Sequence, residues 1–472
     1  MITRMKRNHP YKRGFTAILL AFVLTSGVIV SGIFVADAPN AFADELPAAL
    51  VKSAAPTPPT APPSPSAPST DAGLSVEQAS TVTFENAFLE QEVRKALQKT
   101  EGRLTKNDLA KLTALSASDY VTSLKGLENA VNLEEIRIIQ SYVSDLSPLS
   151  GLIHLRKADL SDNRIHDIGP LKDLTNLTEL NLSRNAISDL SPLEHLTALT
   201  SLDLQENNIA DVHPLHAMEQ LQYLSIVGNF IEHLDGLSGL PKLATLLANN
   251  NLIRELTPLA TDHALKMLDL GYNPLQDLRP LKDLDLIAIQ LDHTEVSELG
   301  VLRGMPSLKN IYWHDNPLTE SSRLFLEDFS KKEEAHIYND VYWMSNYSTP
   351  KIWIDGKVQT FEISPVLSRD TMMVPLRKLL EWFGAEVEWN GDARTVTAMR
   401  NNTKIRLAIG SDAATINDRV VKLESEPFLK KDITLVPLRF VAEAFGVRVQ
   451  WDEHRRWIQL DAQLNETTKK SD

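Results

Sequence analysis

Cysteine is absent from this chain of 472 residues. Disulfide bonds, thiolate metal sites and cysteine nucleophiles are therefore excluded. Basic residues are also in deficit, with 48 Lys and Arg against 62 Asp and Glu. An acidic excess of this size argues against general nucleic-acid binding, which depends on neutralising phosphates.

Signatures of catalysis are missing as well. The chain contains no G-x-S-x-G, no H-E-x-x-H and no Gly-rich phosphate loop. We therefore expect a protein that is not an enzyme and that uses neither a cofactor nor a metal ion. The apolar share of 43% and the charged share of 23% are typical of a globular protein.

The first 43 residues have the pattern of an export signal. Basic residues at 4–13 precede an uncharged stretch at 14–36, and Ala41-Phe42-Ala43 supplies a small-x-small cleavage pattern. We expect a signal peptide over residues 1–43, cleaved after Ala43. The stretch is long enough to span a bilayer, so an uncleaved anchor is the alternative, and it is the only expected contact with a membrane. Export without cysteine suits a Gram-positive bacterium.

Residues 44–80 form a predicted linker. Prolines crowd the segment between Pro56 and Pro68, which is otherwise rich in Ala, Ser and Thr. Such a composition excludes helices and sheet ladders and favours an extended, semi-rigid spacer.

A repeat of 22 residues dominates the middle of the chain. Its unit is L-x-x-L-x-L-x-x-N-x-I-x-D-L-x-P-L-x-x-L, and a degenerate coil precedes it at Leu112. The first leucines of the following coils are Leu133, Leu155, Leu177, Leu199, Leu221, Leu243, Leu265, Leu286 and Leu308. One such coil cannot bury its own leucines, but stacked coils share a continuous core. We predict an α/β leucine-rich-repeat solenoid with short parallel strands over residues 112–330.

Two polar series accompany the leucines. Asparagine occupies one position of most coils, at Asn163, Asn185, Asn207, Asn229, Asn251, Asn273 and Asn316, and only Ser141 and Thr294 break the row. We interpret these amides as inward groups that satisfy the backbone where the chain turns, not as a ligand site. Aspartates at Asp145, Asp167, Asp189, Asp211 and Asp277 are interpreted as turn residues before a Pro-Leu corner, not as calcium ligands.

The exposed end of the stack needs a cap, which we place at residues 81–111. A helical stripe including Phe88 and Val93 is followed by Thr105 and Asp108, the start of a second short helix. Together with the coils and the segment Leu104-Thr105-Lys106-Asn107-Asp108-Leu109, this resembles the internalin-like family of bacterial surface leucine-rich repeat proteins. The resemblance implies a protein that binds other proteins through variable strand positions.

The outward strand positions line the concave face in this fold and are free to carry specificity. In the first four full coils they are mostly charged; from the fifth coil on, apolar and aromatic residues enter. Exposed aromatic side chains of this kind form interface hot spots. The candidate binding residues are Tyr223, Val227, Leu247, Met267, Tyr272, His293, Tyr312 and His314, the two histidines lying in equivalent positions one coil apart. Scattered surface residues, or a surface covered by the next domain, remain alternatives.

After a connector at residues 331–350 the period changes to 62 residues. Val374-Pro375-Leu376-Arg377 recurs as Val436-Pro437-Leu438-Arg439, and Trp389 recurs as Trp451. We predict an α+β tandem-repeat domain over 351–462, each unit a hairpin, strand, helix and hairpin, followed by a tail at 463–472.

Local patterns refine this second domain. Asp355-Gly356 and Asn390-Gly391 predict tight turns, and Pro375 and Pro437 predict first helical turns. Arg377 and Arg439 are expected to pair with Asp370 and Asp432. A buried core is expected to contain Leu379, Trp382, Phe383, Trp389, Phe445 and Trp451.

This tandem resembles the copper amine oxidase N-terminal domain-like family, the stalk module. The resemblance implies a spacer or envelope-associated module, and not oxidase chemistry, because the chain has no H-x-H. We therefore expect a secreted or surface-exposed binding protein whose partner is an unidentified protein or a cell-wall or surface polymer. The alternative is a structural envelope protein in which the C-terminal module associates with the wall.

Overall fold

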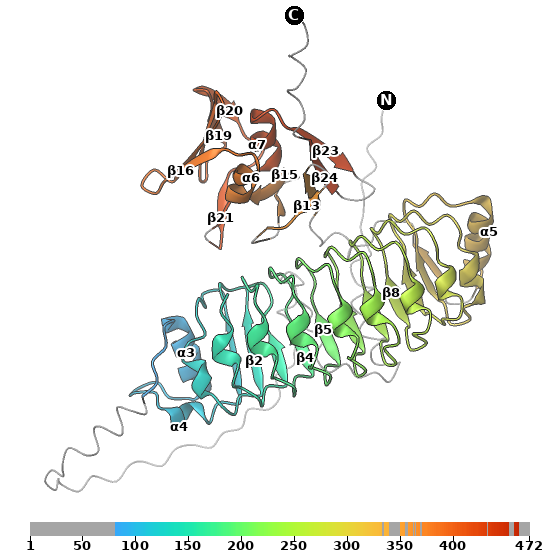
Figure 1. Ribbon diagram of the computed structural model, residues 1–472, viewed down its shortest axis with the longest axis horizontal. Coiled ribbons are helices and arrows are strands. Elements are labelled where there is room, and N and C mark those ends of the chain that lie inside the picture. The colour runs from blue at the N-terminus through green and yellow to red at the C-terminus, as the bar shows by residue number, and fades with distance from the viewer. Residues whose placement is uncertain are drawn as a thin grey trace, which may run out of the picture. The chain divides into compact units, whose positions relative to one another are not determined.

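The computed structural model describes residues 81–332, 335–338, 350–354, 357–361, 363, 365–368, 371–431, 433–452 and 457–461. The predicted signal peptide, the linker, most of the connector and the tail lie outside these residues. Two folded parts are described in turn (Figure 1): the solenoid, residues 81–338, and the tandem module, residues 350–461. No helix among the described residues is both long and apolar enough to cross a membrane.

Two helices close the N-terminal end of the solenoid. Helix α3 (Ala87–Ala96) starts at Asn86, whose side chain accepts a hydrogen bond from the Leu89 N–H at 2.7 Å. Helix α4 (Lys106–Leu109) starts with the predicted capping box, in which the side chains of Thr105 and Asp108 each accept from the other's N–H. The buried faces of both helices cover the first coil.

The solenoid is built on one parallel sheet of eleven strands in sequence order. Neighbouring strands pair with their leucines aligned, as Leu180 does with Leu202. The strands are β1 (Ala114–Ser118), β2 (Glu135–Ile139), β3 (Lys157–Asp159), β4 (Glu179–Asn181), β5 (Ser201–Asp203), β6 (Tyr223–Ser225), β7 (Thr245–Leu247), β8 (Met267–Asp269), β9 (Ala288–Gln290), β10 (Asn310–Tyr312) and β11 (His336–Tyr338). The predicted fold class is confirmed.

Short 3-10 helices make the other side of each coil. Pro follows the first residue in most of them, and a buried leucine ends most of them. They are η1 (Leu127–Asn129), η2 (Ser147–Leu149), η3 (Gly169–Leu171), η4 (Ser191–Leu193), η5 (His213–Leu215), η6 (Asp235–Leu237), η7 (Thr257–Leu259), η8 (Arg279–Leu281) and η9 (Gly300–Gly304). Helix α5 (Glu320–Phe329) covers the last coils with Phe325, Leu326 and Phe329. The leucines of all coils form one continuous buried cluster.

The tandem module contains three sheets and two helices. The sheet orders are β13-β12-β24-β23, β14-β15-β22-β21 and β16-β17-β18-β19-β20. The first unit holds β12 (Lys351–Ile354), β13 (Lys357–Gln359), β14 (Val366–Ser368), β15 (Thr371–Pro375), α6 (Leu376–Trp382), β16 (Glu386–Asn390), β17 (Thr395–Arg400) and β18 (Thr403–Ala408). The second holds β19 (Ala413–Ile416), β20 (Arg419–Lys422), β21 (Phe428–Lys430), β22 (Ile433–Pro437), α7 (Leu438–Ala444), β23 (Arg448–Asp452) and β24 (Trp457–Asp461).

Parallel pairing of β12 with β24 joins the two ends of the tandem module. Leu379 and Phe383 are buried in its core, as predicted, while Trp382 and Phe445 are partly buried against it. Trp389 and Trp451 are 48% and 47% exposed. Their assignment to the core was therefore wrong. Both lie on end strands of their sheets, β16 and β23, so among the described strands each has a neighbour on one side alone.

Of the other local predictions for the tandem module, two were wrong, and the rest concern residues outside the described part of the chain. Asn390-Gly391 does not make a two-residue turn, because β16 ends at Asn390 and four turn residues follow before β17. Pro375 and Pro437 precede the helices as N-cap residues instead of starting the first turn. The turn at 355–356 and the partners predicted for the two arginines, residues 370 and 432, lie outside the described residues.

Candidate binding surface on the strands of the solenoid

The outward side of the eleven-stranded sheet, called here the strand face, is set by the alternation of each strand. In β4, Leu180 points into the core, and its neighbours Glu179 and Asn181 point outward. Because the strands are in register, outward residues of successive coils form rows: Tyr223 lies beside Thr245, and Thr245 beside Met267. The repeat thus holds side chains from different coils at fixed spacing.

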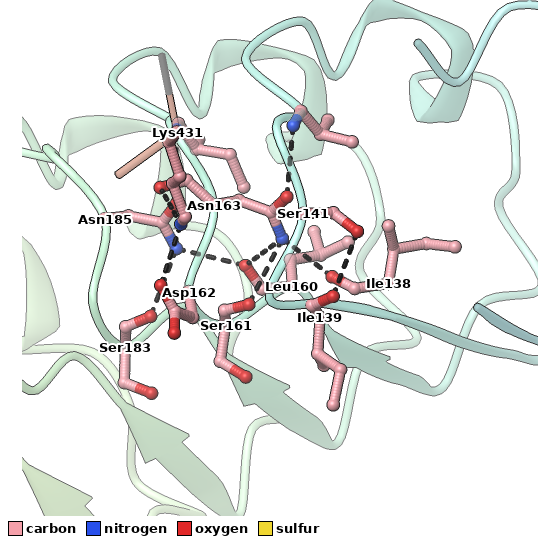
Figure 2. A network of polar contacts seen from close by, with 12 residues as sticks. Ile138, Ile139, Ser141, Leu160, Ser161, Asp162, Asn163, Ser183, Asn185 and Lys431 are labelled. Carbon is pink, nitrogen blue, oxygen red and sulfur yellow. Dashed lines mark hydrogen bonds and ion pairs between the residues drawn. The ribbon is translucent and has the colours of Figure 1, made fainter. Parts of the chain in front are cut away.

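Asparagines form a ladder immediately behind the strand face. Figure 2 shows the amides of Asn163 and Asn185 directed at backbone groups. The Asn163 side chain accepts from the Val143 N–H at 3.1 Å and donates to the carbonyls of Ile138 and Leu160 at 2.7 and 3.1 Å. Asn185 repeats this pattern one coil later. The structural interpretation of the asparagines is confirmed: their hydrogen-bonding groups are used within the stack.

Aspartates in the turns are likewise occupied by the backbone. Asp145 accepts from the Ser147 N–H, and Asp189 from the Ser191 N–H, each at 2.8 Å. Both bonds span two residues, as in an Asx turn. The predicted turn role is therefore confirmed for this series.

A residue with left-handed backbone precedes the ladder position of each coil. The positive φ angles belong to Asp119, Gln140, Asp162, Arg184, Glu206, Gly228, Asn250, Tyr272, His293 and Asp315. This conformation is uncommon for bulky residues and costs free energy. Tyr272 and His293 have φ angles of 56° and 54°. This backbone conformation sets the direction in which their two rings leave the chain. The same register corrects one prediction: the equivalent of His293 in the next coil is Asp315, not His314.

The N-terminal part of the strand face carries charges that neutralise one another. Arg137 lies 3.3 Å from Asp159, and Lys157 lies 2.9 Å from Glu179. Each pair joins adjacent coils. These four side chains are consequently satisfied within the solenoid and offer little net charge to a partner.

Rings accumulate on the C-terminal part of the strand face. Tyr272 stacks on His293 with ring centroids 4.3 Å apart, and His293 meets His314 edge-on at 5.3 Å. The Nδ1 atom of His293 lies 3.1 Å from an Asp315 oxygen. The sequence-predicted residues Tyr272, His293 and His314 are thus brought into one cluster.

Only half of the predicted binding residues reach the surface. Val227, Tyr272, His293 and Tyr312 are buried. Tyr223, Leu247, Met267 and His314 are partly exposed. Three of these four lie on consecutive strands, β6, β7 and β8. The accessible apolar area is therefore narrower than predicted.

Buried carboxylates beside these rings were not anticipated from the sequence. Asp269 accepts from the Asn249 amide at 2.8 Å and the Gly271 N–H at 3.1 Å, and Asp292 accepts from the His314 N–H at 2.7 Å. They are only 4% and 0% exposed. Burial raises the pKa of Asp269 to about 8 and that of Asp292 to about 7. For Asp269, the last residue of β8, the sequence signal is an aspartate at an outward strand position next to apolar neighbours.

Within the described part of the chain, no group of three or more His, Cys, Asp or Glu side chains could hold a metal ion. The described residues of the strand face offer partly exposed apolar side chains around Tyr223, hydrogen-bonded carboxylates and stacked rings.

Both folded parts match known protein families. A leucine-rich repeat model of two copies matches residues 153–195 and 175–215, and the model of the copper amine oxidase N-terminal domain matches residues 353–460. Internalin C2 of Listeria monocytogenes is 31% identical to this chain over 94% of its own length and 44% of this chain, with a TM-score of 0.42. The chain is an internalin-like leucine-rich repeat protein. It carries the copper amine oxidase N-terminal domain at its C-terminal end.

A second internalin of Listeria monocytogenes (inlF) is 26% identical to this internalin-like chain, with a TM-score of 0.39. The match covers 54% of this chain and 91% of the length of that internalin. No curated protein matches the chain.

Proposed function

We propose that this chain is exported, acts at the bacterial surface or as a secreted protein, and binds a protein partner through the strand face without catalysing a reaction. The observation that carries the proposal is the group of partly exposed apolar side chains on three consecutive strands, Tyr223, Leu247 and Met267. Aromatic and methionine side chains are enriched at interface centres. The asparagine ladder behind them holds this surface rigid, which lowers the entropic cost of binding.

The candidate contact residues now separate into two roles. Tyr223, Leu247, Met267 and His314 are the contact positions of the proposal. Val227, Tyr272, His293 and Tyr312 are buried and are not contact positions. Substituting a buried ring would test stability, whereas substituting an accessible one tests binding.

The test compares two variants of the full chain on intact bacterial and host cells. Tyr223→Ser combined with Met267→Ser is expected to reduce binding at least about tenfold, because each truncated hot-spot residue costs about 1–2 kcal/mol. Ile153→Ser is the matched control, since Ile153 is an exposed apolar residue outside the strand face. Equal binding by both variants, with unchanged melting temperatures, would remove the strand face from the proposal.

A wall-associated structural role is the second candidate. It is supported by the exposed ring of Trp451 in the tandem module, since an exposed tryptophan offers apolar area next to a polar group. This role is favoured if the chain still binds cells that have been treated with protease, and if Trp451→Ala reduces that binding. Protease-sensitive binding that Trp451→Ala leaves unchanged favours the protein partner.

A further inference from the structure

The five-stranded sheet of the tandem module ends in two open strands. All five residues of β16 are exposed, and among the described strands β16 pairs with β17 alone. At the opposite edge the one described partner of β20 is β19, and three of the four residues of β20 are exposed. Open edges present unpaired backbone groups that can extend the sheet into another chain.

The two edges carry opposite charge. Strand β16 contains Glu386 and Glu388 and no basic residue, while β20 contains Arg419 and Lys422 and no acidic residue. Lys422 lies 3.6 Å from Asp412 but keeps 82% of its side chain exposed. Two copies of one edge would oppose like charges, whereas β16 against β20 opposes unlike charges.

On β16 apolar side chains alternate with the two acidic ones, whereas on β20 Val420 shares a face with Lys422 and Val421 shares the other face with Arg419. Val387 and Trp389 on β16 are 46% and 48% exposed, and Val420 on β20 is 70% exposed. Charges on an edge strand by themselves protect against aggregation. Here they flank large exposed apolar residues, so the charges select the partner edge and the apolar residues supply contact area.

The β20 edge is preformed. Asn417 and Asp418 have consecutive φ angles of 46° and 66°, the signature of a tight two-residue hairpin turn. The turn holds β20 against β19 in register from Ala413 with Lys422 to Ile416 with Arg419. No ordering of this strand is therefore needed before it meets another.

We propose that β20 of one molecule pairs with β16 of a second copy, so that the chain self-associates head to tail. Such a contact is heterologous and leaves one open edge at each end, so it builds chains and not closed dimers. Each added copy brings another solenoid, which would give multivalent display of the strand face. The self-association itself does not depend on the proposed function of that face.

The test is sedimentation velocity of the full chain without the expected signal peptide, residues 1–43, over a series of protein concentrations. The average mass is expected to rise with concentration and to fall with added salt, because the pairing charges are exposed. Variant one, E386K with E388K, has two basic edges; variant two, R419E with K422E, has two acidic edges. Each alone is expected to lose association completely.

Mixing the two variants provides the decisive result. The basic β20 of variant one then meets the acidic β16 of variant two, which is the native pair, so association is expected to return. Circular dichroism checks that both variants remain folded. A monomeric wild-type chain at all concentrations, or association that neither variant weakens or that mixing fails to restore, would overturn the proposal. Tyr223→Ser with Met267→Ser should associate like the wild type.

Discussion

The solenoid and the tandem module both repeat a short unit, but they end their repeats differently. In the solenoid each coil pairs only with its neighbours, so the stack is open and needs α3, α4 and α5 as covers. In the tandem module the first and last strands, β12 and β24, pair with each other. The stack is therefore closed by helices at its ends, whereas the tandem module joins its own ends and has β16 and β20 as the end strands of its five-stranded sheet.

The largest expected effect tests the joined ends of the tandem module. Leu460 on β24 is fully buried and pairs with Ile354 of β12. Leu460→Ala removes core volume at the joint and is expected to lower the free energy of unfolding by about 3 kcal/mol. Denaturant unfolding followed by tryptophan fluorescence measures the loss.

Leu429→Ala is the matched control for this substitution, because Leu429 is 42% exposed on edge strand β21. It should cost less than about 1 kcal/mol. Similar losses for the two variants would mean that the pairing of β12 with β24 does not hold the module together.

A middle effect is expected in the ladder of the open stack. Asn207 accepts from the Ile187 N–H at 3.0 Å and donates to the carbonyls of Leu182 and Leu204 at 2.9 and 3.0 Å. Asn207→Ala leaves buried backbone groups without partners and is expected to cost about 2 kcal/mol. Thermal unfolding measures it, with Asn208→Ala, at the partly exposed neighbouring position, as control. Equal melting temperatures would contradict a structural role for the ladder.

How much of each part could be predicted from the sequence depends on how far apart in the chain its interacting residues lie. Spacing of 22 residues together with period-two alternation placed Leu180 and Leu202 in the core, because each coil repeats the same local rule. The burial of Tyr272 was not predictable, since it depends on a left-handed backbone and on stacking with His293 in the next coil.

In the tandem module the period of 62 residues showed that Trp389 and Trp451 are equivalent, but not that they stand at sheet edges. The place of Trp451 on the end strand β23 depends on the pairing of β24 with β12, two strands about a hundred residues apart in the chain. Pairing at such separation leaves no local pattern. The edge positions of β16 and β20 were not predicted either, because a run of strands does not show which of them end a sheet.

The last expected effect distinguishes the two parts by how their stability depends on pH. The solenoid buries carboxylates, among them Asp269, whereas no carboxylate in the described part of the tandem module is buried. Burial raises the pKa of Asp269 to about 8, from about 3.9 in the unfolded chain. Between these values the native state keeps a proton that the unfolded state has lost. The stabilisation is full below about pH 4 and is lost as the pH rises through about 8.

Raising the pH from about 6 to about 9 should therefore lower the melting temperature of the wild-type chain. Asp269→Asn has the same shape without a titrating group, so its melting temperature should change less over this range. Asp173→Asn, at an exposed position, is the control and should keep the wild-type slope. Parallel slopes for all three chains would mean that Asp269 is ionised in the folded protein. In that case the strand face would present a buried negative charge at neutral pH, and a partner would have to supply a cation to match it.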